Sequence, residues 1–317
     1  MNQIFKYISQ QFHSMGKIYT KSSIAGKILL LFILLILVIV IFKGNKGTKE
    51  GFEQSAQFLF KTDGEVYDDF YSDIYDYLVF NTIKNQYEVG EIVNKTTPTS
   101  ESIILDIGCG TGHHVGDLAS KNLNVVGIDI SPSMIAKAKE NYPELNFKIE
   151  NALNEGAFQP HAFTHILCLY FTIYYMKDKN LFFHNCMEWL MPGGYLILHL
   201  VYRDEFDPIL PPGNPLMIVS PQRYAKKRIT TTKIKFTDFS YSAEFKLNKE
   251  TNIAKFVEKF KNDINGKVRK NEHIMYMESQ KAILVMAQNA GFILEGQIDL
   301  IKTQYEYQYL YILVKPN

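Results

Sequence analysis

Two carboxylates and three glycines form the group of residues in this sequence best suited to binding a ligand. Asp106 precedes Gly108, Gly110 and Gly112, and Asp129 follows 23 residues after Asp106. Glycines at alternate positions lack the Cβ atoms that would keep a ligand away from the backbone. In nucleotide-binding βαβ units, a carboxylate about 20 residues after such a turn accepts hydrogen bonds from ribose hydroxyls. The spacing therefore predicts a nucleotide-binding turn.

Short apolar runs position both carboxylates. Residues 103–107 lead into the glycines, and residues 125–129 end at the second carboxylate. Apolar runs of this length that are bounded by glycine are typical of buried strands. The dinucleotide fingerprint G-x-G-x-x-G would place its third glycine at position 113, where the sequence has His113. The sequence thus argues against a nicotinamide or flavin dinucleotide, and a dehydrogenase is a distant alternative.

The glycine turn has a close family parallel. Leu105-Asp-Ile-Gly-Cys-Gly-Thr-Gly112 resembles the first motif of class I S-adenosylmethionine-dependent methyltransferases. The likeness continues through residues 163–170, which are similar to the family's fourth strand, and through the Pro-Gly-Gly turn and strand of residues 191–199. It covers about residues 106–199. The resemblance implies an α/β, Rossmann-like, doubly wound fold with a seven-stranded sheet, and S-adenosyl-L-methionine as the cofactor.

The resemblance also implies which residues bind the cofactor. Ile130 is expected beside adenine, and Asn151 stands where the family has an acidic residue that contacts the exocyclic amine of adenine. An amide oxygen can accept the same hydrogen bond. Leu169 belongs to the end of the strand that faces the methyl group. The expected cofactor-binding residues are Asp106, Gly108, Gly110, Gly112, Asp129, Ile130, Asn151, Ala152 and Leu169.

Histidines are the candidates for acid–base chemistry. Methyl transfer from a sulfonium is an in-line displacement, so catalysis comes mostly from alignment and from exclusion of water. An oxygen or nitrogen acceptor can also use a general base, and histidine titrates nearest neutral pH. We rank His199, at the end of a predicted strand, and His273 above His113 and His114 near the turn.

Three tyrosines are expected on the acceptor side. Tyr71 lies in an aromatic helical stretch, residues 66–77, of the kind that covers the cofactor in similar methyltransferases, and Tyr174 and Tyr175 follow the fourth strand. Core packing is the alternative for each tyrosine. Residues 169–172 lack the motif of nucleic-acid amino-methyltransferases, and the net charge is +1. Nucleic acid is therefore not an expected partner.

The amino-terminal region contains a long apolar stretch. As a helix, residues 24–42 would extend roughly 28 Å, close to the hydrocarbon core of a bilayer. The long leader and the lysines after the stretch argue against a cleaved signal peptide. We expect an N-terminal segment at 1–23, a single transmembrane helix at 24–42 and a linker at 43–62. Equal numbers of lysines flank the two ends of this stretch, so the distribution of positive charge does not predict its orientation in the membrane. We expect the catalytic domain in the cytosol because S-adenosylmethionine is made there.

Residues 63–317 are predicted to form one methyltransferase domain, in which residues 203–277 form an antiparallel insertion on the acceptor side. Three cysteines in no metal-like spacing predict neither a disulfide framework nor a metal site. The predicted function is methyl transfer by a membrane-anchored enzyme to a small-molecule, lipid or membrane-near acceptor. The alternative is a non-catalytic adaptor that binds the cofactor or a partner on the same fold. The sequence carries no signal for the oligomeric state.

Overall fold

The structure is a computed structural model, which describes residues 23, 24, 26, 27, 56–208, 227–235, 237 and 239–317. The chain divides into two units, Met1–Glu50 and Gly51–Asn317. The predicted N-terminal segment lies outside the described residues except for residue 23, and the predicted transmembrane helix except for residues 24, 26 and 27. Within the described parts of the chain, no helix combines the length and apolarity needed to cross a bilayer.

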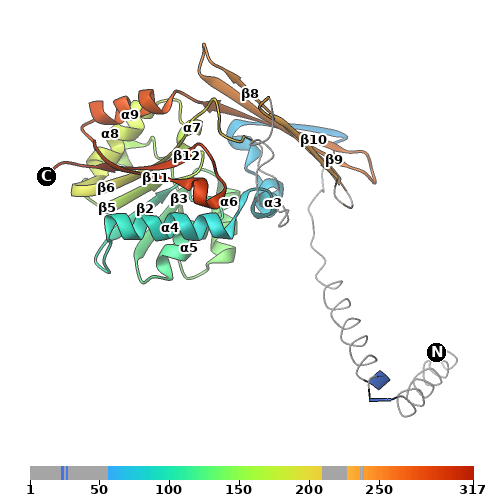
Figure 1. Ribbon diagram of the computed structural model, residues 1–317, viewed down its shortest axis with the longest axis horizontal. Helices are drawn as coiled ribbons and strands as arrows, with labels where there is room; N and C mark the ends of the chain where they lie inside the picture. The colour runs from blue at the N-terminus through green and yellow to red at the C-terminus, as the bar shows by residue number, and fades with distance from the viewer. Residues whose placement is uncertain (1–22, 25, 28–55, 209–226, 236, 238) are drawn as a thin grey trace. The chain divides into compact units, whose positions relative to one another are not determined.

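A seven-stranded sheet forms the centre of the second unit (Figure 1), in the order β11-β12-β6-β5-β2-β3-β4. The strands from β6 to β4 in this order are parallel, whereas β12 is antiparallel to both of its neighbours. This arrangement confirms the predicted α/β sheet. The strands are β2 (Ile103–Ile107), β3 (Asn124–Asp129), β4 (Asn146–Ile149), β5 (Phe163–Cys168), β6 (Leu190–Val201), β11 (Ile293–Asp299) and β12 (Gln308–Val314).

Helices cover both faces of this sheet, as Figure 1 shows, and two hydrophobic clusters fill the space beneath them. The Ser131 hydroxyl accepts a hydrogen bond from the Met134 N–H and Pro132 occupies the first turn, so a helix begins directly after β3. The only tryptophan of the chain, Trp189, is buried in the cluster on the other face. One face carries α4 (Thr82–Thr96), α5 (His113–Ala119) and α6 (Pro132–Asn141), and the other carries α8 (Lys179–Trp189) and α9 (Gln280–Asn289).

A second sheet of five strands has the order β1-β10-β9-β8-β7. The alternating pattern predicted antiparallel strands in this region, and β7 to β10 are antiparallel. Residues 58–62, which the sequence predicts as linker, instead form a strand that pairs in parallel with β10. The strands are β1 (Phe58–Thr62), β7 (Thr231–Lys235), β8 (Phe239–Asn248), β9 (Ile253–Asn262) and β10 (Val268–Tyr276).

Short helical elements connect the two sheets. The helix α3 packs on α6, whereas η1 and α7 pack on β10. The Asp68 carboxylate starts α3 by accepting a hydrogen bond from the Tyr71 N–H at 3.2 Å, and it also accepts one from the Arg269 guanidinium of β10 at 2.9 Å. One carboxylate thus holds α3 beside the second sheet. These connecting elements are η1 (Asp63–Val66), α3 (Asp69–Val79) and α7 (Thr172–Tyr175). Two further short helices lie between strands of the seven-stranded sheet, η2 (Glu155–Ala157) between β4 and β5 and η4 (Leu300–Thr303) between β11 and β12.

Candidate active site

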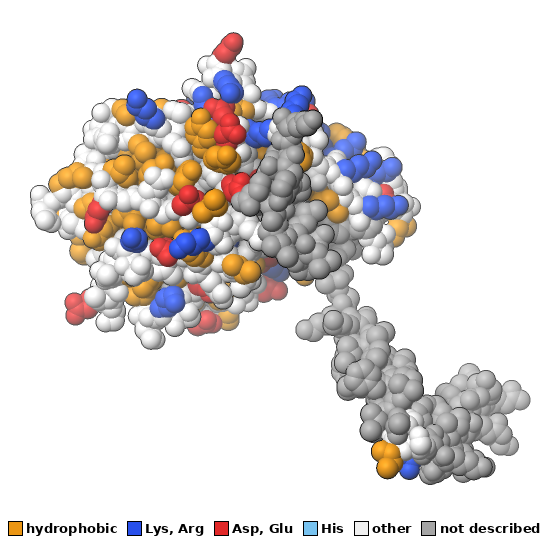
Figure 2. All heavy atoms as spheres, viewed as in Figure 1, with side chains coloured by type: hydrophobic (Ala, Val, Ile, Leu, Met, Phe, Trp, Pro, Cys, Tyr) orange, Lys and Arg blue, Asp and Glu red, His pale blue; other side chains and the backbone are white. Residues whose placement is uncertain are grey.

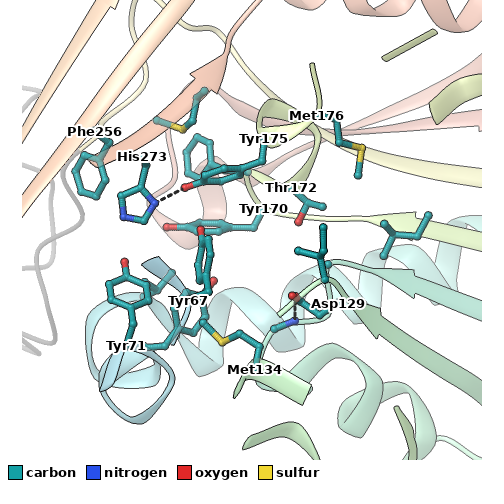
Figure 3. A pocket seen from close by; sticks show the side chains of 18 of the residues that line it. Tyr67, Tyr71, Asp129, Met134, Tyr170, Thr172, Tyr175, Met176, Phe256 and His273 are labelled. Atoms are coloured by element: carbon teal, nitrogen blue, oxygen red, sulfur yellow. Dashed lines mark hydrogen bonds between the residues drawn. The ribbon is translucent and has the colours of Figure 1, made fainter. Parts of the chain in front are cut away.

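A cavity of about 330 Å³ lies between the seven-stranded sheet, α3 and the five-stranded sheet. Figure 3 shows Asp129 at one side of it and His273 with Tyr175 at the other, with Tyr67 and Tyr170 between them. The glycine turn that follows β2 and the end of β3 supply the first side, where open α/β sheets bind their ligands. Aromatic residues of α3, α7, β8, β9 and β10 supply the second side.

The first two glycines line the cavity and the third does not. Gly108 and Gly110 have φ values of +70° and +53°, and a Cβ at Gly108 would lie 2.5 Å from the Thr172 side chain. Gly112 is the N-cap of α5, where a Cβ would lie 2.8 Å from the Phe147 ring. Cofactor binding by Gly112 thus stays a prediction, because this glycine does not line the large cavity. This glycine is needed for its positive φ and for close packing.

Asp129 stands at the end of β3 with both carboxylate oxygens held by the backbone. They accept hydrogen bonds from the Ser131 N–H at 2.9 Å and the Gly110 N–H at 3.0 Å. Burial raises the pKa of Asp129, although these N–H donors act to lower it. Each carboxylate oxygen has a second lone pair, so the group retains acceptor capacity toward the cavity that it lines.

The residues expected around adenine also border the cavity. Ile130, Asn151 and Ala152 all line it, Ile130 with 61% of its surface exposed. The Asn151 Oδ1 accepts a hydrogen bond from the Leu153 N–H at 2.9 Å, so one lone pair of the expected acceptor oxygen is already used within the chain. The second lone pair and the NH₂ group are what Asn151 can offer to a ligand.

Asp106 and Leu169 line a smaller cavity of about 80 Å³ on the other side of the glycine turn. Asp106 is 2% exposed, and its Oδ2 has no hydrogen-bond partner in the described part of the chain. Burial raises the pKa of this carboxyl to about 7. A buried carboxylate oxygen without a donor is costly, so a ligand that brings a cationic nitrogen to it would be stabilised.

Charged side chains surround the Asp106 cavity. The Lys84 ammonium lies 2.7 Å from the Glu88 carboxylate, whose other oxygen lies 3.1 Å from His114 Nε2. Burial acts to raise the pKa of Glu88, but Lys84 and His114 outweigh burial and lower the pKa to about 2. Tyr170 borders both cavities and adopts φ = +51°, an uncommon conformation for a bulky residue. Such strained residues gather at functional sites.

A buried polar network occupies the far side of the large cavity. His273 Nδ1 lies 2.9 Å from the Tyr175 hydroxyl (Figure 3). His273 Nε2 lies 2.9 Å from the Glu258 carboxylate. The Tyr241 hydroxyl donates to Glu258 at 2.8 Å and the Asn271 amide donates to it at 3.4 Å. Burial acts to raise the pKa of Glu258, but its donors, with His273 first, bring about a net lowering. Glu258 is therefore a buried carboxylate.

The register of two strands places this network. Glu258 of β9 pairs with Asn271 of β10, and His273 follows two residues later on the same inward face. The Arg269 guanidinium donates to the Asn271 side chain at 2.8 Å and lies over the Phe70 ring at 4.6 Å. His273 was predicted from the sequence, whereas Glu258 was not. The signal for Glu258 was a carboxylate at an apolar position of an alternating strand.

Two other expected site residues lie outside both cavities. His199 of β6 is fully buried with Nδ1 against the Tyr170 carbonyl, and burial lowers its pKa to about 4, so the imidazole is neutral. The Tyr174 hydroxyl accepts a hydrogen bond from the Val201 N–H at 2.9 Å in the core. The structure thus places the predicted catalytic His199 and the predicted acceptor-side Tyr174 in the packed interior, away from both cavities. Tyr71 and Tyr175 line the large cavity as expected.

The central sheet and its glycine turn match a known protein family. The sequence profile of a family described as a methyltransferase domain matches residues 104–194. This stretch of the chain is therefore similar to a methyltransferase domain.

Individual methyltransferases match over a similar stretch. The chain is 32% identical over 101 residues to the putative methyltransferase 235L of Invertebrate iridescent virus 6, which covers 31% of this chain and 37% of the relative. It is 28% identical over 117 residues to the ubiquinone biosynthesis O-methyltransferase of Xylella fastidiosa, covering 36% and 47%. It is 31% identical over 114 residues to the dTDP-4-amino-2,3,4,6-tetradeoxy-D-glucose N,N-dimethyltransferase of Saccharopolyspora spinosa, covering 35% and 45%. The chain thus spans less than half the length of each of these relatives.

Solved structures extend the likeness of the fold beyond residues 104–194. An S-adenosylmethionine-dependent methyltransferase from Clostridium acetobutylicum superposes with a TM-score of 0.60 at 15% identity, over 78% of this chain and 98% of that chain. The amino pentose methyltransferase CalS10 from Micromonospora echinaspora, with its cofactor bound, gives 0.51 at 15% identity, over 73% and 91%. The second unit therefore has the class I methyltransferase fold.

The residues at the glycine turn fit S-adenosylmethionine. Gly108 lines the cavity, and a Cβ there would press on the Thr172 side chain. Asp129 has free lone pairs for a ribose diol, and the unpaired Asp106 oxygen suits an ammonium group. The cofactor carries both of these complementary groups. Its adenine would lie beside Ile130 and Ala152.

Proposed function

We propose that the protein is an S-adenosylmethionine-dependent methyltransferase that acts on a small-molecule acceptor held in the large cavity. One observation carries the proposal. The cavity joins the glycine turn and Asp129 to the network of Glu258, His273 and Tyr175 in a single volume. When bound, the cofactor supplies an electrophilic methyl group on a sulfonium. The enclosing aromatic residues exclude water, and the cavity holds the acceptor in line with that group.

The network can take the proton that an acceptor loses. Since Glu258 is a carboxylate, it accepts a hydrogen bond from His273 Nε2–H, which leaves Nδ1 as the acceptor of the Tyr175 O–H. A proton that arrives at the Tyr175 oxygen can thus be matched by transfer of the tyrosine's own proton to His273 Nδ1. The negative charge of Glu258 stabilises the imidazolium that forms.

The names of the relatives support a small acceptor that is methylated on oxygen or on nitrogen. One relative is a ubiquinone biosynthesis O-methyltransferase and another is an N,N-dimethyltransferase of a nucleotide-linked amino sugar. The non-catalytic adaptor remains the competing function, because the glycine turn alone would bind the cofactor in both cases. The buried carboxylate–histidine–tyrosine network favours the enzyme, since an adaptor has no need of a proton acceptor in its cavity.

The purified full chain, in mild detergent, allows a direct test. S-adenosylmethionine is titrated by calorimetry into the wild type, the Asp129→Asn variant and the matched control Glu101→Gln, whose exposed side chain precedes β2 at the opposite edge of the sheet. We expect binding that is weakened only in Asp129→Asn. Incubation with labelled methyl donor and cytosolic or membrane extracts should then label an acceptor. Binding without any labelled product supports the adaptor, and absence of binding refutes the cofactor.

We also propose that residues 24–42 anchor the enzyme in a membrane with the catalytic unit in the cytosol. The apolar length of this stretch and the cytosolic origin of the cofactor support this arrangement. Protease treatment of sealed vesicles that carry the chain tests it. Digestion of residues 250–317 from outside the vesicles supports a cytosolic domain, and protection of these residues contradicts it.

A further inference from the structure

The acceptor side of the large cavity is aromatic and acidic. Glu258 is 1% exposed and lies beside His273, and Asp129 and Glu150 contribute further carboxylates toward the cofactor end. None of the described residues that line this cavity is a lysine or an arginine. The rings that line it include those of Tyr67, Tyr71, Tyr75, Tyr170, Tyr175 and Phe256.

The positive charges of the surrounding elements are directed elsewhere. Along β9, Glu258 is buried whereas Lys255, Lys259 and Lys261 are exposed, because successive side chains of a strand point to opposite faces. Figure 2 shows Lys and Arg side chains gathered at the side of the molecule where Figure 1 places the five-stranded sheet. Arg269 points inward, but its guanidinium donates to the Asp68 carboxylate at 2.9 Å. Arg228 is not among the lining residues, but its guanidinium lies 4.9 Å from the Phe206 ring and donates to backbone carbonyls. Among the described lining residues, the charge on the acceptor side is therefore that of Glu258 beside His273.

The tyrosine rings keep their neutral form in this setting. Burial raises the pKa values of Tyr67, Tyr71 and Tyr175, so their hydroxyls stay protonated at neutral pH. Tyr67 lies edge-on to Tyr71 and Tyr175, with ring centroids 5.5 and 5.9 Å away. Neutral aromatic faces carry negative electrostatic potential and attract cations, most strongly where water is excluded.

We infer that the acceptor is an amine whose nitrogen enters this aromatic, acidic side of the cavity. The inference rests on the proposed methyltransferase function and specifies its substrate class. A protonated or methylated nitrogen gains attraction from the tyrosine rings and from Glu258. A phosphate or carboxylate near the reacting atom would be repelled by Glu258. No lysine or arginine among the described lining residues would offset that repulsion. A neutral alcohol would gain neither attraction.

The chemistry balances with the groups present. A bound ammonium first passes one proton to the Tyr175 oxygen, whose own proton moves to His273 Nδ1. The free nitrogen lone pair then forms the N–C bond to the methyl carbon as the S–C bond of the sulfonium breaks. The sulfur keeps that bonding pair and leaves as a neutral thioether, and the methylated nitrogen becomes the cation. The product cation retains the attraction of the tyrosine rings, while the imidazolium of His273 pairs with Glu258 until it loses its proton.

A pair of probes that differ only in charge tests the inference. Choline and its carbon isostere 3,3-dimethylbutan-1-ol are titrated by calorimetry into the full chain saturated with S-adenosylhomocysteine, and phosphocholine provides an anionic comparison. We expect choline to bind about tenfold more tightly than the isostere and more tightly than phosphocholine. The preference should shrink in Glu258→Gln and persist in Glu244→Gln. Glu244 is the matched control because it lies on the same sheet and forms a salt bridge with Lys246 on its outer side.

The outcomes separate this inference from the proposed function. If S-adenosylhomocysteine does not bind, the cofactor assignment fails. If it binds, and choline binds no more tightly than the isostere or shows no measurable binding, only the amine inference is overturned. The comparison of probes on the wild-type chain decides the matter even if Glu258→Gln does not fold. Labelled product that carries its methyl group on oxygen would also overturn the inference.

Discussion

Replacement of Asp106 by asparagine should stabilise the protein without cofactor and abolish cofactor binding. The carboxyl is 2% exposed, and burial raises its pKa from 3.8 to about 7. A raised pKa means that the folded state binds the proton more tightly than the unfolded state. The stability that comes from this proton is complete below pH 4 and is lost as the pH rises through 7. At 1.36 kcal/mol per pH unit, the whole loss is about 4 kcal/mol.

Asparagine has nearly the same shape and carries no charge, so the variant escapes this loss. Between pH 5 and pH 8.5 the advantage of Asp106→Asn over the wild type should grow by about 3 kcal/mol, because the folded carboxyl ionises near pH 7. The assay is urea unfolding of the full chain without cofactor at both pH values, followed by the fluorescence of buried Trp189. The exposed Glu101→Gln serves as the control and should show no such change.

A stability difference between Asp106→Asn and the wild type that is the same at pH 5 and pH 8.5 would refute the reasoning. It would mean that Asp106 is not a buried carboxyl that ionises near neutrality. The second part of the prediction concerns binding at pH 8.5. There the wild type should regain stability when S-adenosylhomocysteine is added, because an ammonium group satisfies the unpaired Oδ2, whereas the variant should gain nothing.

Three further substitutions test the two sides of the cavity, and a fourth serves as a control. Gly108→Ala introduces a Cβ 2.5 Å from the Thr172 side chain at φ = +70°. Cofactor affinity measured by calorimetry should therefore fall at least about tenfold, with a stability loss of ~1–2 kcal/mol. An unchanged affinity would contradict a place for the Gly108 backbone in the cofactor site. Glu258→Gln removes the charge behind His273, and kcat should fall about 10- to 100-fold while cofactor affinity is retained, as initial rates would show. Tyr175→Phe should lower kcat about tenfold or more, whereas Tyr174→Phe should leave kcat intact and cost ~1 kcal/mol in urea unfolding. Equal losses of kcat in the two tyrosine variants would remove Tyr175 from the proton path.

The cofactor side was largely predictable because its signals are local. The residues of β2, the glycine turn, β3 and the start of α6 are consecutive, and each follows from apolar run length, glycine spacing or helix capping. The exceptions are matters of side-chain contact. Gly112 has the same spacing as its neighbours, but the approach of Phe147 gives it a packing role, and Asn151 uses its oxygen on Leu153.

The acceptor side was only partly predictable because it is assembled from distant segments. His199 and His273 both belong to apolar strands. Only the position of each strand in the fold shows that His199 lies in the core and that His273 lines the cavity. Glu258 became recognisable once the register of β9 and β10 placed it beside His273. The strand β1 was missed because its pairing partner is about 200 residues away, and no local pattern marks such a pairing.

The pairing of β1 with β10 has a consequence for how the protein folds. It closes a loop of about 200 residues, and contacts of such separation form slowly because chain entropy must be lost before they contribute. During synthesis, β1 and α3 leave the ribosome long before β10. The tyrosines of α3 therefore lack their packing partner His273 until β10 has been synthesised. The glycine turn, β3 and α6 can meet much earlier. We therefore expect refolding to restore cofactor binding before it restores the acceptor cavity.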